Sequence, residues 1–549
     1  MEADPEAPPP GEPPDDSASP GPAPAGSAGR LIDLAQVALA LTACALVWGL
    51  LLAYLASPPR TADLFWHVAS GRYFLEQGGL VSVDPFAHTT AGRTWVLQAW
   101  VFQLLVGSCD ALGGLPLVRA CAAGLGLAIL AAAAALLRQA GAKPAAALAV
   151  LTLLGVGSWL RVTEVRPHLL SILFFFVFAR GLYFVREPVS RRRLALFCGL
   201  QVLWVNCHAV GLLGFLFYVG AVLSERLGAA LQRRLGDEVP QPRLPLAGVP
   251  LLFAATLASP NHLLLWSYAF MDLGVAKLIT DEWGRYDPFT LTFDPRHLPV
   301  TLVVAWCVIA TALALVGRLL WRPRQTLSEL DPRLLGFGLV GAAAGFYALR
   351  FSWLWFFPLL TLAALPRSSR PERALHAALP ALALGLGLLF VDQSPRRLDL
   401  REFMGSRASP EFPRAACDLF LAAELEGNLF NHYTFGGYLI YRLYPRAKVF
   451  VDGRTFIHKE NLDRYFRLCV AAPPKRERLL AEAGVDVFVG SLQLYGLMDD
   501  APGWVCVYRD PLTTLHVPRG SANLTRITRF YRERGLPFDP ERGLPPPRR

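Results

Sequence analysis

Long apolar segments alternate with short polar loops over the first two thirds of the chain. A helix needs about 20 apolar residues to cross a bilayer, and segments approaching this length recur between residues 31 and 391. We expect eleven membrane spans, at residues 31–56, 115–138, 144–160, 168–186, 194–208, 210–228, 246–259, 299–320, 333–349, 351–366 and 374–391. The run 95–112 is either a further span or a helix along the membrane interface.

The pattern changes after residue 392. The runs "GNLFN", "AKVFVD", "VDVFVG", "WVCVYRD" and "TTLHVP" are short and rich in β-branched or aromatic residues, which is typical of strands. Between them, "PEFPRAACDLFLAAEL" and "PPKRERLLAEAG" have the periodicity of helices. We therefore expect a mainly α transmembrane domain over residues 31–392, followed by a small α/β domain over residues 393–520.

Composition supports a membrane protein. The 549 residues are 53% hydrophobic and 17% charged, whereas soluble proteins have about 25% charged residues. Nine Cys without a CxxC pair indicate neither a disulfide framework nor a zinc site. Residues 1–30, rich in Pro, Ala and Gly, and residues 521–549, rich in Pro and Arg, are expected to be disordered tails.

The net charge of +10 is better explained by membrane orientation than by nucleic acid, because the basic residues cluster in alternate loops. Basic residues favour the cytoplasmic side. With all clusters there, the N-terminus is inside, and the loop 57–114 and the α/β domain are outside, with 95–112 along the outer interface. The clusters are Arg138/Lys143, Arg186 with Arg191–Arg193, Arg226/Arg233/Arg234, Arg318/Arg322/Arg324 and Arg367/Arg370/Arg373.

This topology brings unusual polar residues from separate segments to the outer face. Ionisable groups near a membrane are costly, so they are expected to line a polar cavity and to carry function. The candidate site residues are Asp63, His67, Asp84, Arg166, His168, Asn206, His208, Glu282, Trp283 and Arg350.

The chemistry of these side chains suggests distinct roles. Asp63 and Asp84 are candidates for a general base toward an acceptor hydroxyl. Arg350 and Arg166, with His168, are candidates for phosphate binding, since Arg forms bidentate charge-assisted bonds. The remaining candidates are expected to bind substrate.

Each role has a structural alternative. Asp84 precedes Pro85 and also suits a turn. Arg350 also suits a helix end where its charge snorkels to the interface. The remaining alternatives are a helix-face hydrogen bond for Asp63 with His67, capping or packing for His208, and the aromatic belt of the interface for Trp283.

In the α/β domain, "VFVDGR" places Asp452 and Arg454 directly after an expected strand. Loops after strands often carry binding groups. Alternatively, Asp452 and Gly453 form a turn, and Arg454 pairs with Asp452 or with a neighbouring acid.

Several motifs resemble those of a large group of bacterial polytopic membrane proteins. The first outer loop, "DLFWHVASGRYFLEQGGLVSVDPFAHTTAGRTWVLQAW", resembles a pattern D-x-x-W-H-x-x-x-G followed by D-P-F-S-x-T. "RPHLLS", "LWVNCHAVGLLG", "ASPNH", "DEW", "LRFSWLWF" and "NHYTFGGYLIYRLYPRAKVFVDGR" follow in the same order. The architecture is similar to that of the GT-C glycosyltransferases.

This resemblance implies transfer of a sugar from a polyprenyl-phosphate carrier to an acceptor on the outer face of a bacterial inner membrane. Asp63 would be the base and Asp84 the second candidate. GT-C enzymes often have Asp-Glu or Glu-Asp there, whereas Leu64 follows Asp63 in this chain. No cofactor is expected, and a divalent metal and the oligomeric state are left open. The alternatives are a flippase for a lipid-linked saccharide and a non-catalytic envelope-assembly protein.

Overall fold

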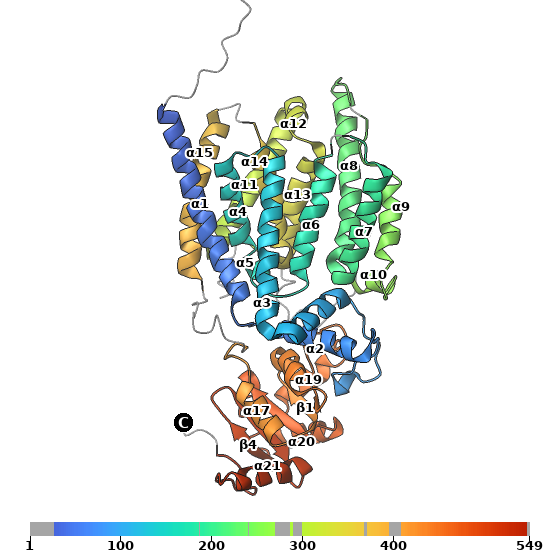
Figure 1. Cartoon of the computed structure of the whole chain (residues 1–549), viewed down its shortest axis with the longest axis vertical. Helices are drawn as coiled ribbons and strands as arrows, with labels where there is room; N and C mark the ends of the chain where they lie inside the picture. The colour runs from blue at the N-terminus through green and yellow to red at the C-terminus, as the bar shows by residue number, and fades with distance from the viewer. Residues whose placement is uncertain are drawn as a thin grey trace, which may run out of the picture.

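The computed structural model describes residues 27–185, 187–239, 241–269, 286–288, 299–366, 370–394 and 408–545. Most of the expected N-terminal tail lies outside these residues. The described chain has two parts, a bundle of helices and a smaller α/β domain beyond one end of the bundle (Figure 1).

The bundle confirms the expected mainly α domain, since each of the eleven apolar segments contains a helix. These helices run side by side along the bundle (Figure 1). They are α1 Ser27–Ala56, α3 Trp100–Gln139, α4 Pro144–Gly157, α6 His168–Tyr183, α7 Arg191–Cys207, α8 Leu212–Arg234, α9 Gly248–Thr256, α11 Pro299–Trp321, α13 Pro332–Tyr347, α14 Phe356–Ala364 and α15 Arg370–Gln393.

Five helices of the described chain are both long and apolar enough to cross a bilayer, namely α1, α3, the helical segment Ala209–Arg234 that contains α8, α11 and α15. The shorter apolar helices pack among them, and α4 lies against α1 and α15. The chain is therefore a multi-pass membrane protein.

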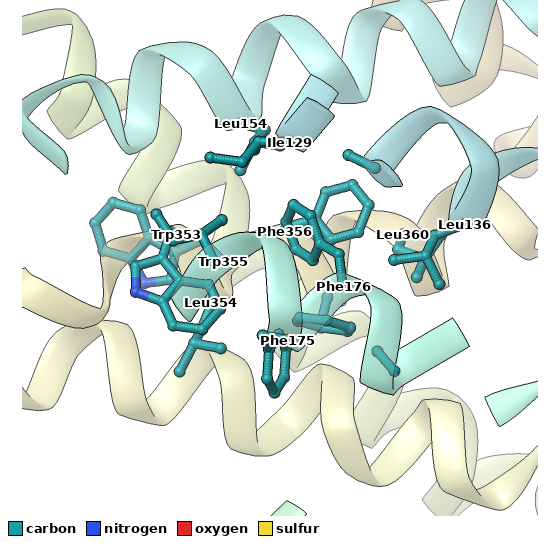
Figure 2. Packing of buried hydrophobic residues seen from close by; sticks show 14 of the residues in the cluster. Ile129, Leu136, Leu154, Phe175, Phe176, Trp353, Leu354, Trp355, Phe356 and Leu360 are labelled. Atoms are coloured by element: carbon teal, nitrogen blue, oxygen red, sulfur yellow. The ribbon is translucent and has the colours of Figure 1, made fainter. Parts of the chain in front are cut away.

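Aromatic side chains fill the centre of the bundle. Phe175 and Phe176 of α6 are buried against Trp353 and Phe356 (Figure 2), with ring centroids 5.0 Å apart for Phe175–Trp353 and 4.9 Å for Phe176–Phe356. Trp353 belongs to the 3-10 helix η5 Leu349–Trp355, which leads directly into α14. The Phe175–Trp353 pair is edge-on, and such a pair contributes about 0.5–1.5 kcal/mol beyond its buried area.

The first outer loop folds onto the end of the bundle. It contains α2 Ala62–Gln77, which packs against α3. α3 is kinked at Gly114, whose φ of 66° departs from the helix and is readily adopted only by glycine. The part of α3 before this kink corresponds to the expected interfacial segment 95–112, and it turns aside from the direction of the bundle (Figure 1).

The α/β domain contains the five strands expected from the sequence. Their order in the sheet is β2-β1-β3-β5-β4. β2, β1 and β3 are parallel, whereas β5 is antiparallel to β3 and β4. The strands are β1 Gly427–Asn431, β2 Ala447–Lys448, β3 Val487–Ser491, β4 Trp504–Arg509 and β5 Thr513–Pro518; the helices are α17 Arg414–Ala422, α18 Gly436–Leu443, α19 Leu462–Val470, α20 Pro473–Glu482 and α21 Ala522–Glu533.

The structure differs from the expected tail at residues 521–549, because part of this segment forms α21. Ser521 caps the helix by accepting a hydrogen bond from the Leu524 amide (3.2 Å). Ile527 and Phe530 are buried in the same apolar cluster as the sheet residues. The three-residue spacing of these apolar side chains gives α21 one apolar face. The Arg-rich composition alone suggested a disordered segment. Burial of the apolar face of α21 offsets the conformational entropy that the segment loses when it becomes ordered.

The α/β domain and the first outer loop share one apolar cluster. Phe65 of α2 is fully buried, and its ring lies 5.0 Å from both the Phe412 and Tyr438 rings. The loop also pairs with the domain at an isolated β-bridge between Ala87 and Val449, where the Val449 amide donates to the Phe86 carbonyl (3.0 Å) and the His88 amide donates to the Val449 carbonyl (3.1 Å). Burying one Phe contributes about 1.5–3 kcal/mol, so this joint is a stable contact.

Candidate active site

Asp63 lies in the first turn of α2, at the end of the bundle that faces the α/β domain (Figure 1). One carboxylate oxygen, Oδ1, accepts a hydrogen bond from the Trp66 indole nitrogen (3.1 Å), one turn along the same helix. The other, Oδ2, is ion-paired with Arg166. The Asp63 side chain is still 17% exposed. Its carboxylate is therefore oriented by two donors and remains accessible, as a general base requires.

Arg166 bridges two carboxylates. It lies in the loop between the short helix α5 Trp159–Val162 and α6, and it pairs with Asp63 and with Glu164 (3.2 Å to Oε2). All three side chains are about four-fifths buried, so the pairing is weakly screened. Asp63, Arg166 and Glu164 thus form one ion-pair network.

Two histidines of the candidate site, His168 and His208, lie at or beside the start of α6. His168 is the first residue of α6, and its Nε2 is hydrogen-bonded to the Arg161 carbonyl. His208 follows α7, and its Nδ1 is hydrogen-bonded to Ser171 Oγ (2.8 Å). Arg166 and His208 both act electrostatically on His168. The structure thus places Arg166, His168 and His208 in one polar cluster.

His67 extends this cluster from α2. Its ring lies on that of Trp66, with 3.6 Å between centroids, and meets Phe102 edge-on at 5.1 Å. Burial, reinforced by the charge of His208, lowers the pKa of His67 well below 6.5. His67 is therefore a neutral ring at neutral pH, and Trp66, which orients Asp63, packs on it.

Buried neutral histidines make the stability of the protein depend on pH. Burial lowers the pKa of His67, His88 and His516 below the ordinary value of 6.5. The unfolded chain binds these protons below pH 6.5 and the folded chain does not, so stability falls as pH decreases through that value. We expect the melting temperature in detergent to be lower at pH 5 than at pH 7.5.

His516→Gln should reduce the slope of melting temperature against pH. His262→Asn is the matched control, because His262 is exposed, and it should leave the slope unchanged. A melting temperature that is constant or rises toward pH 5 would contradict the burial of neutral rings.

Asn206 connects helices. Its Oδ1 accepts from the Trp100 indole nitrogen (2.7 Å), and its Nδ2 donates to the carbonyls of Val202 (2.8 Å) and Ala258 (2.7 Å). Its amide oxygen and nitrogen thus hold α3, α7 and the end of α9 together. These contacts indicate a structural role for Asn206, which links the helices.

Asp84 lies in the joint between the first outer loop and the α/β domain. Its side chain is fully buried, and its two oxygens accept from the Arg454 guanidinium (2.6 and 3.2 Å). Asp84 also accepts from the Phe86 amide (3.0 Å) and from Thr90 Oγ1. Arg454 pairs in addition with Asp452 (2.6 Å). This geometry matches the paired alternative for Arg454, with Asp84 as the neighbouring acid.

Arg350 is half-buried between the end of α13 and α14, and its guanidinium lies 5.9 Å from the Phe351 ring. Phe351 also lines an apolar groove of about 210 Å³ that runs between α8 and α13. The groove is lined by Leu213, Leu216, Phe217, Gly220, Ser224, Gly336, Phe337, Val340, Ala344, Phe351 and Leu354. Leu216 and Val340 are 46% and 58% exposed, so the groove borders the outer surface of the bundle. The candidates Glu282 and Trp283 lie outside the described residues.

One group of potential metal ligands occurs among the residues that the structure describes. Donor atoms of Asp499, Cys506 and His516 lie within 4.8 Å of one another, with Cys506 and His516 paired across β4 and β5. Arg509 pairs with Asp499 and lies 3.5 Å from the Cys506 sulfur. Because the guanidinium already supplies the positive charge, these residues form an ion-pair network within the α/β domain.

The candidate set from the sequence omits residues that the structure adds to the site. Arg161 is 7% exposed and acts electrostatically on His168, and Glu164 shares Arg166 with Asp63. Their signal in the sequence is three charged residues, Arg161, Glu164 and Arg166, within six positions beside apolar spans. Trp66 is not among the candidates, because its hydrogen bond to Asp63 depends on the geometry of α2.

No protein-family model matches the chain, and no curated protein matches its sequence. The fold, however, is similar to solved structures. The archaeal oligosaccharyltransferase AglB from Archaeoglobus fulgidus, in complex with an inhibitory peptide and a dolichol-phosphate, matches with a TM-score of 0.55 and 11% identity, over 84% of this chain and 69% of that one.

A second structure of the Archaeoglobus fulgidus oligosaccharyltransferase, a complex with Zn and sulfate, has a TM-score of 0.52 and 11% identity, over 88% and 73% of the two chains. ArnT from Cupriavidus metallidurans, bound to undecaprenyl phosphate, has a TM-score of 0.48 and 15% identity, over 90% and 99%. At such identities the likeness to the oligosaccharyltransferase concerns the fold. The fold of this chain is therefore similar to that of the archaeal oligosaccharyltransferase.

Proposed function

We propose that the protein is a membrane glycosyltransferase that moves a sugar from a polyprenyl-phosphate carrier to an acceptor at the outer face of the membrane. The observation that carries this proposal is the accessible Asp63 carboxylate, oriented by Trp66 and Arg166 at the end of a GT-C-like bundle. The solved AglB complex contains a dolichol-phosphate, which supports a lipid phosphate as the carrier.

In this reaction, an acceptor hydroxyl attacks the anomeric carbon of the sugar and the bond from that carbon to the phosphate oxygen breaks. Asp63 accepts the hydroxyl proton, and the polyprenyl phosphate leaves with the electron pair. Arg166 holds the Asp63 carboxylate toward the acceptor. Such proton transfer contributes about 10²–10⁴-fold to the rate.

The carrier would bind on the other side of the site. Its polyprenyl chain fits the apolar groove between α8 and α13, and its phosphate would lie near Arg350, next to the groove residue Phe351. A guanidinium can bind a phosphate with two parallel hydrogen bonds. The groove supplies the apolar contact that a hydrocarbon chain needs.

Arg350→Ala is expected to raise the KM for the lipid-linked donor about 10-fold or more, because a hydrogen bond to a charged group is worth about 1.5–3 kcal/mol. Arg350→Lys should raise the donor KM less than Arg350→Ala does, since lysine keeps the positive charge but cannot form two parallel hydrogen bonds. Arg192→Ala is the matched control, an exposed arginine at the start of α7. A donor KM unchanged by Arg350→Ala would remove Arg350 from the carrier site.

The orientation follows from the basic loops. The arginine clusters lie at the end of the bundle opposite the α/β domain (Figure 1). They are found at the ends of α3, α8 and α11 and at the starts of α7 and α15. The positive-inside rule therefore supports an extracytoplasmic α/β domain in a bacterial inner membrane. Protease added to intact spheroplasts is expected to cut this domain. Full protection would indicate the opposite orientation.

Membranes containing the protein, supplied with radiolabelled polyprenyl-phosphate sugars and envelope acceptors, are expected to form a new glycosidic bond. A flippase is the main alternative. It would move the labelled carrier across sealed vesicles and leave the sugar on the lipid, and that outcome would replace the transferase proposal.

A further inference from the structure

The α/β domain approaches Asp63 so closely that its backbone lies against the Asp63 carboxylate. A Cβ atom built on Gly453 would overlap Asp63 Oδ1 and lie 3.2 Å from Trp66 Nε1. The backbone of Gly453 therefore lies against the carboxylate and against the indole nitrogen that orients it. With Trp66 and Arg166 on the other sides, this turn is a third element that fixes Asp63.

A second glycine allows the same approach. A Cβ on Gly437, at the start of α18, would overlap the Ala62 carbonyl oxygen and lie 3.1 Å from Trp66 Cδ1. Ala62 begins α2, directly before Asp63. Two separate elements of the α/β domain thus lack side chains at the points where they meet the first turn of α2, and larger residues would push the domain away from it.

The turn that carries Gly453 is itself rigid. Asp452 Oδ1 accepts from the Arg454 amide (2.9 Å), and the Thr455 amide donates to the Gly453 carbonyl (2.9 Å). The Arg454 side chain is 3% exposed and pairs with both Asp452 and Asp84 (2.6 Å each). His458 Nε2 donates to Asp452 Oδ2 (3.0 Å). A buried charge network therefore fastens the turn to the first outer loop.

We propose that the turn Asp452–Arg454 is a positioning element of the active site, which holds the Asp63 carboxylate toward the acceptor. The α/β domain then completes the transferase site. The chemistry of Asp63 in this inference rests on the proposed function. The close contact between Gly453 and Asp63 does not, so the two can fail separately.

Gly453→Ala tests the positioning role. The φ of Gly453 is one that alanine adopts, so the added methyl group acts through its contacts with Asp63 and with Trp66, the residue that orients Asp63. A misplacement of about 1 Å costs about 10²-fold in rate. We expect kcat to fall about 10–100-fold, with the donor KM and the melting temperature near those of the wild type. Gly453→Ser should have a larger effect in the same direction.

Gly79→Ala is the matched control, because Gly79 lies in the same outer loop with an ordinary φ and open space around it; it should leave kcat unchanged. A wild-type kcat in Gly453→Ala would overturn the proposal. A fall in kcat that only follows a fall in folded protein would also overturn it, since the turn would then have a structural role alone.

A second measurement does not need activity. Asp63→Cys combined with Gly453→Cys should form a disulfide under mild oxidation, so that the bundle and the α/β domain stay joined after cleavage at a protease site inserted between residues 394 and 408. Gly79→Cys with Gly453→Cys should separate under the same conditions. Separation of the 63/453 pair would overturn the inference. A cross-linked 63/453 pair, together with a wild-type chain that shows no transferase activity, would reject the proposed function and keep the contact.

Discussion

Asp63→Asn is expected to abolish sugar transfer, lowering kcat about 10²–10⁴-fold, while the protein folds and inserts normally. The amide keeps the size of the side chain and can still accept from Trp66, but it cannot take a proton from the acceptor. The fold should persist, because Arg166 retains its pair with Glu164. The measurement is the initial rate of transfer from labelled polyprenyl-phosphate sugar in membranes with equal amounts of protein.

Asp500→Asn is the control for this change, since it removes the charge of an exposed aspartate in the α/β domain, and it should transfer sugar at the wild-type rate. Asp63→Glu, which keeps the carboxylate and moves it by one methylene, should retain more activity than Asp63→Asn. Full transfer by Asp63→Asn would show that Asp63 is not the base, and Asp84 would then be the next residue to test.

Arg454→Met is expected to be the most destabilising single change in the joint between the two parts. It removes one buried cation and leaves the buried carboxylates of Asp84 and Asp452 without the partner that they share. Removing one member of a buried pair costs about 3–5 kcal/mol. We expect a melting temperature lower by several degrees and faster proteolysis between the bundle and the α/β domain.

Asp84→Asn should cost less than Arg454→Met, because the pair between Arg454 and Asp452 remains. Adding Asp84→Asn to Arg454→Met should cost less than the sum of the two single changes, since it removes one of the two unpaired carboxylates. Additive losses would show that these residues do not share one network. Arg529→Met, at an exposed pair with Glu424, is the surface control and should change stability by at most about 1 kcal/mol.

The Arg454 network also has a pH dependence of its own. The pairs with Arg454 and His458 outweigh burial and hold the pKa of Asp452 far below its ordinary value of 3.8. A carboxyl with a lowered pKa in the folded state stabilises it above the unfolded pKa, and this stability is lost as pH falls below it. The loss of stability through Asp452 therefore begins at a lower pH than the loss of stability through the buried histidines.

Much of the architecture was predicted from the sequence because periodicity and length are local properties. Eleven apolar segments gave eleven helices, and the runs "GNLFN", "WVCVYRD" and "TTLHVP" became β1, β4 and β5. The prediction for residues 521–549 differed from the structure because an Arg-rich composition hid the apolar face of α21. That face is stable only against the sheet, which is a tertiary effect.

The sequence by itself determined that the chain is a multi-pass membrane protein with a small α/β domain after the apolar helices, and it predicted that polar residues from separate segments collect at one end of the bundle. Only the tertiary structure decided which of them meet. Asp63 and Asp84 are 21 positions apart, yet one pairs with Arg166 and stays accessible, and the other is buried by Arg454. These partners lie 103 and 370 residues away. Local pattern cannot supply such contacts, because they depend on how helices and sheet pack.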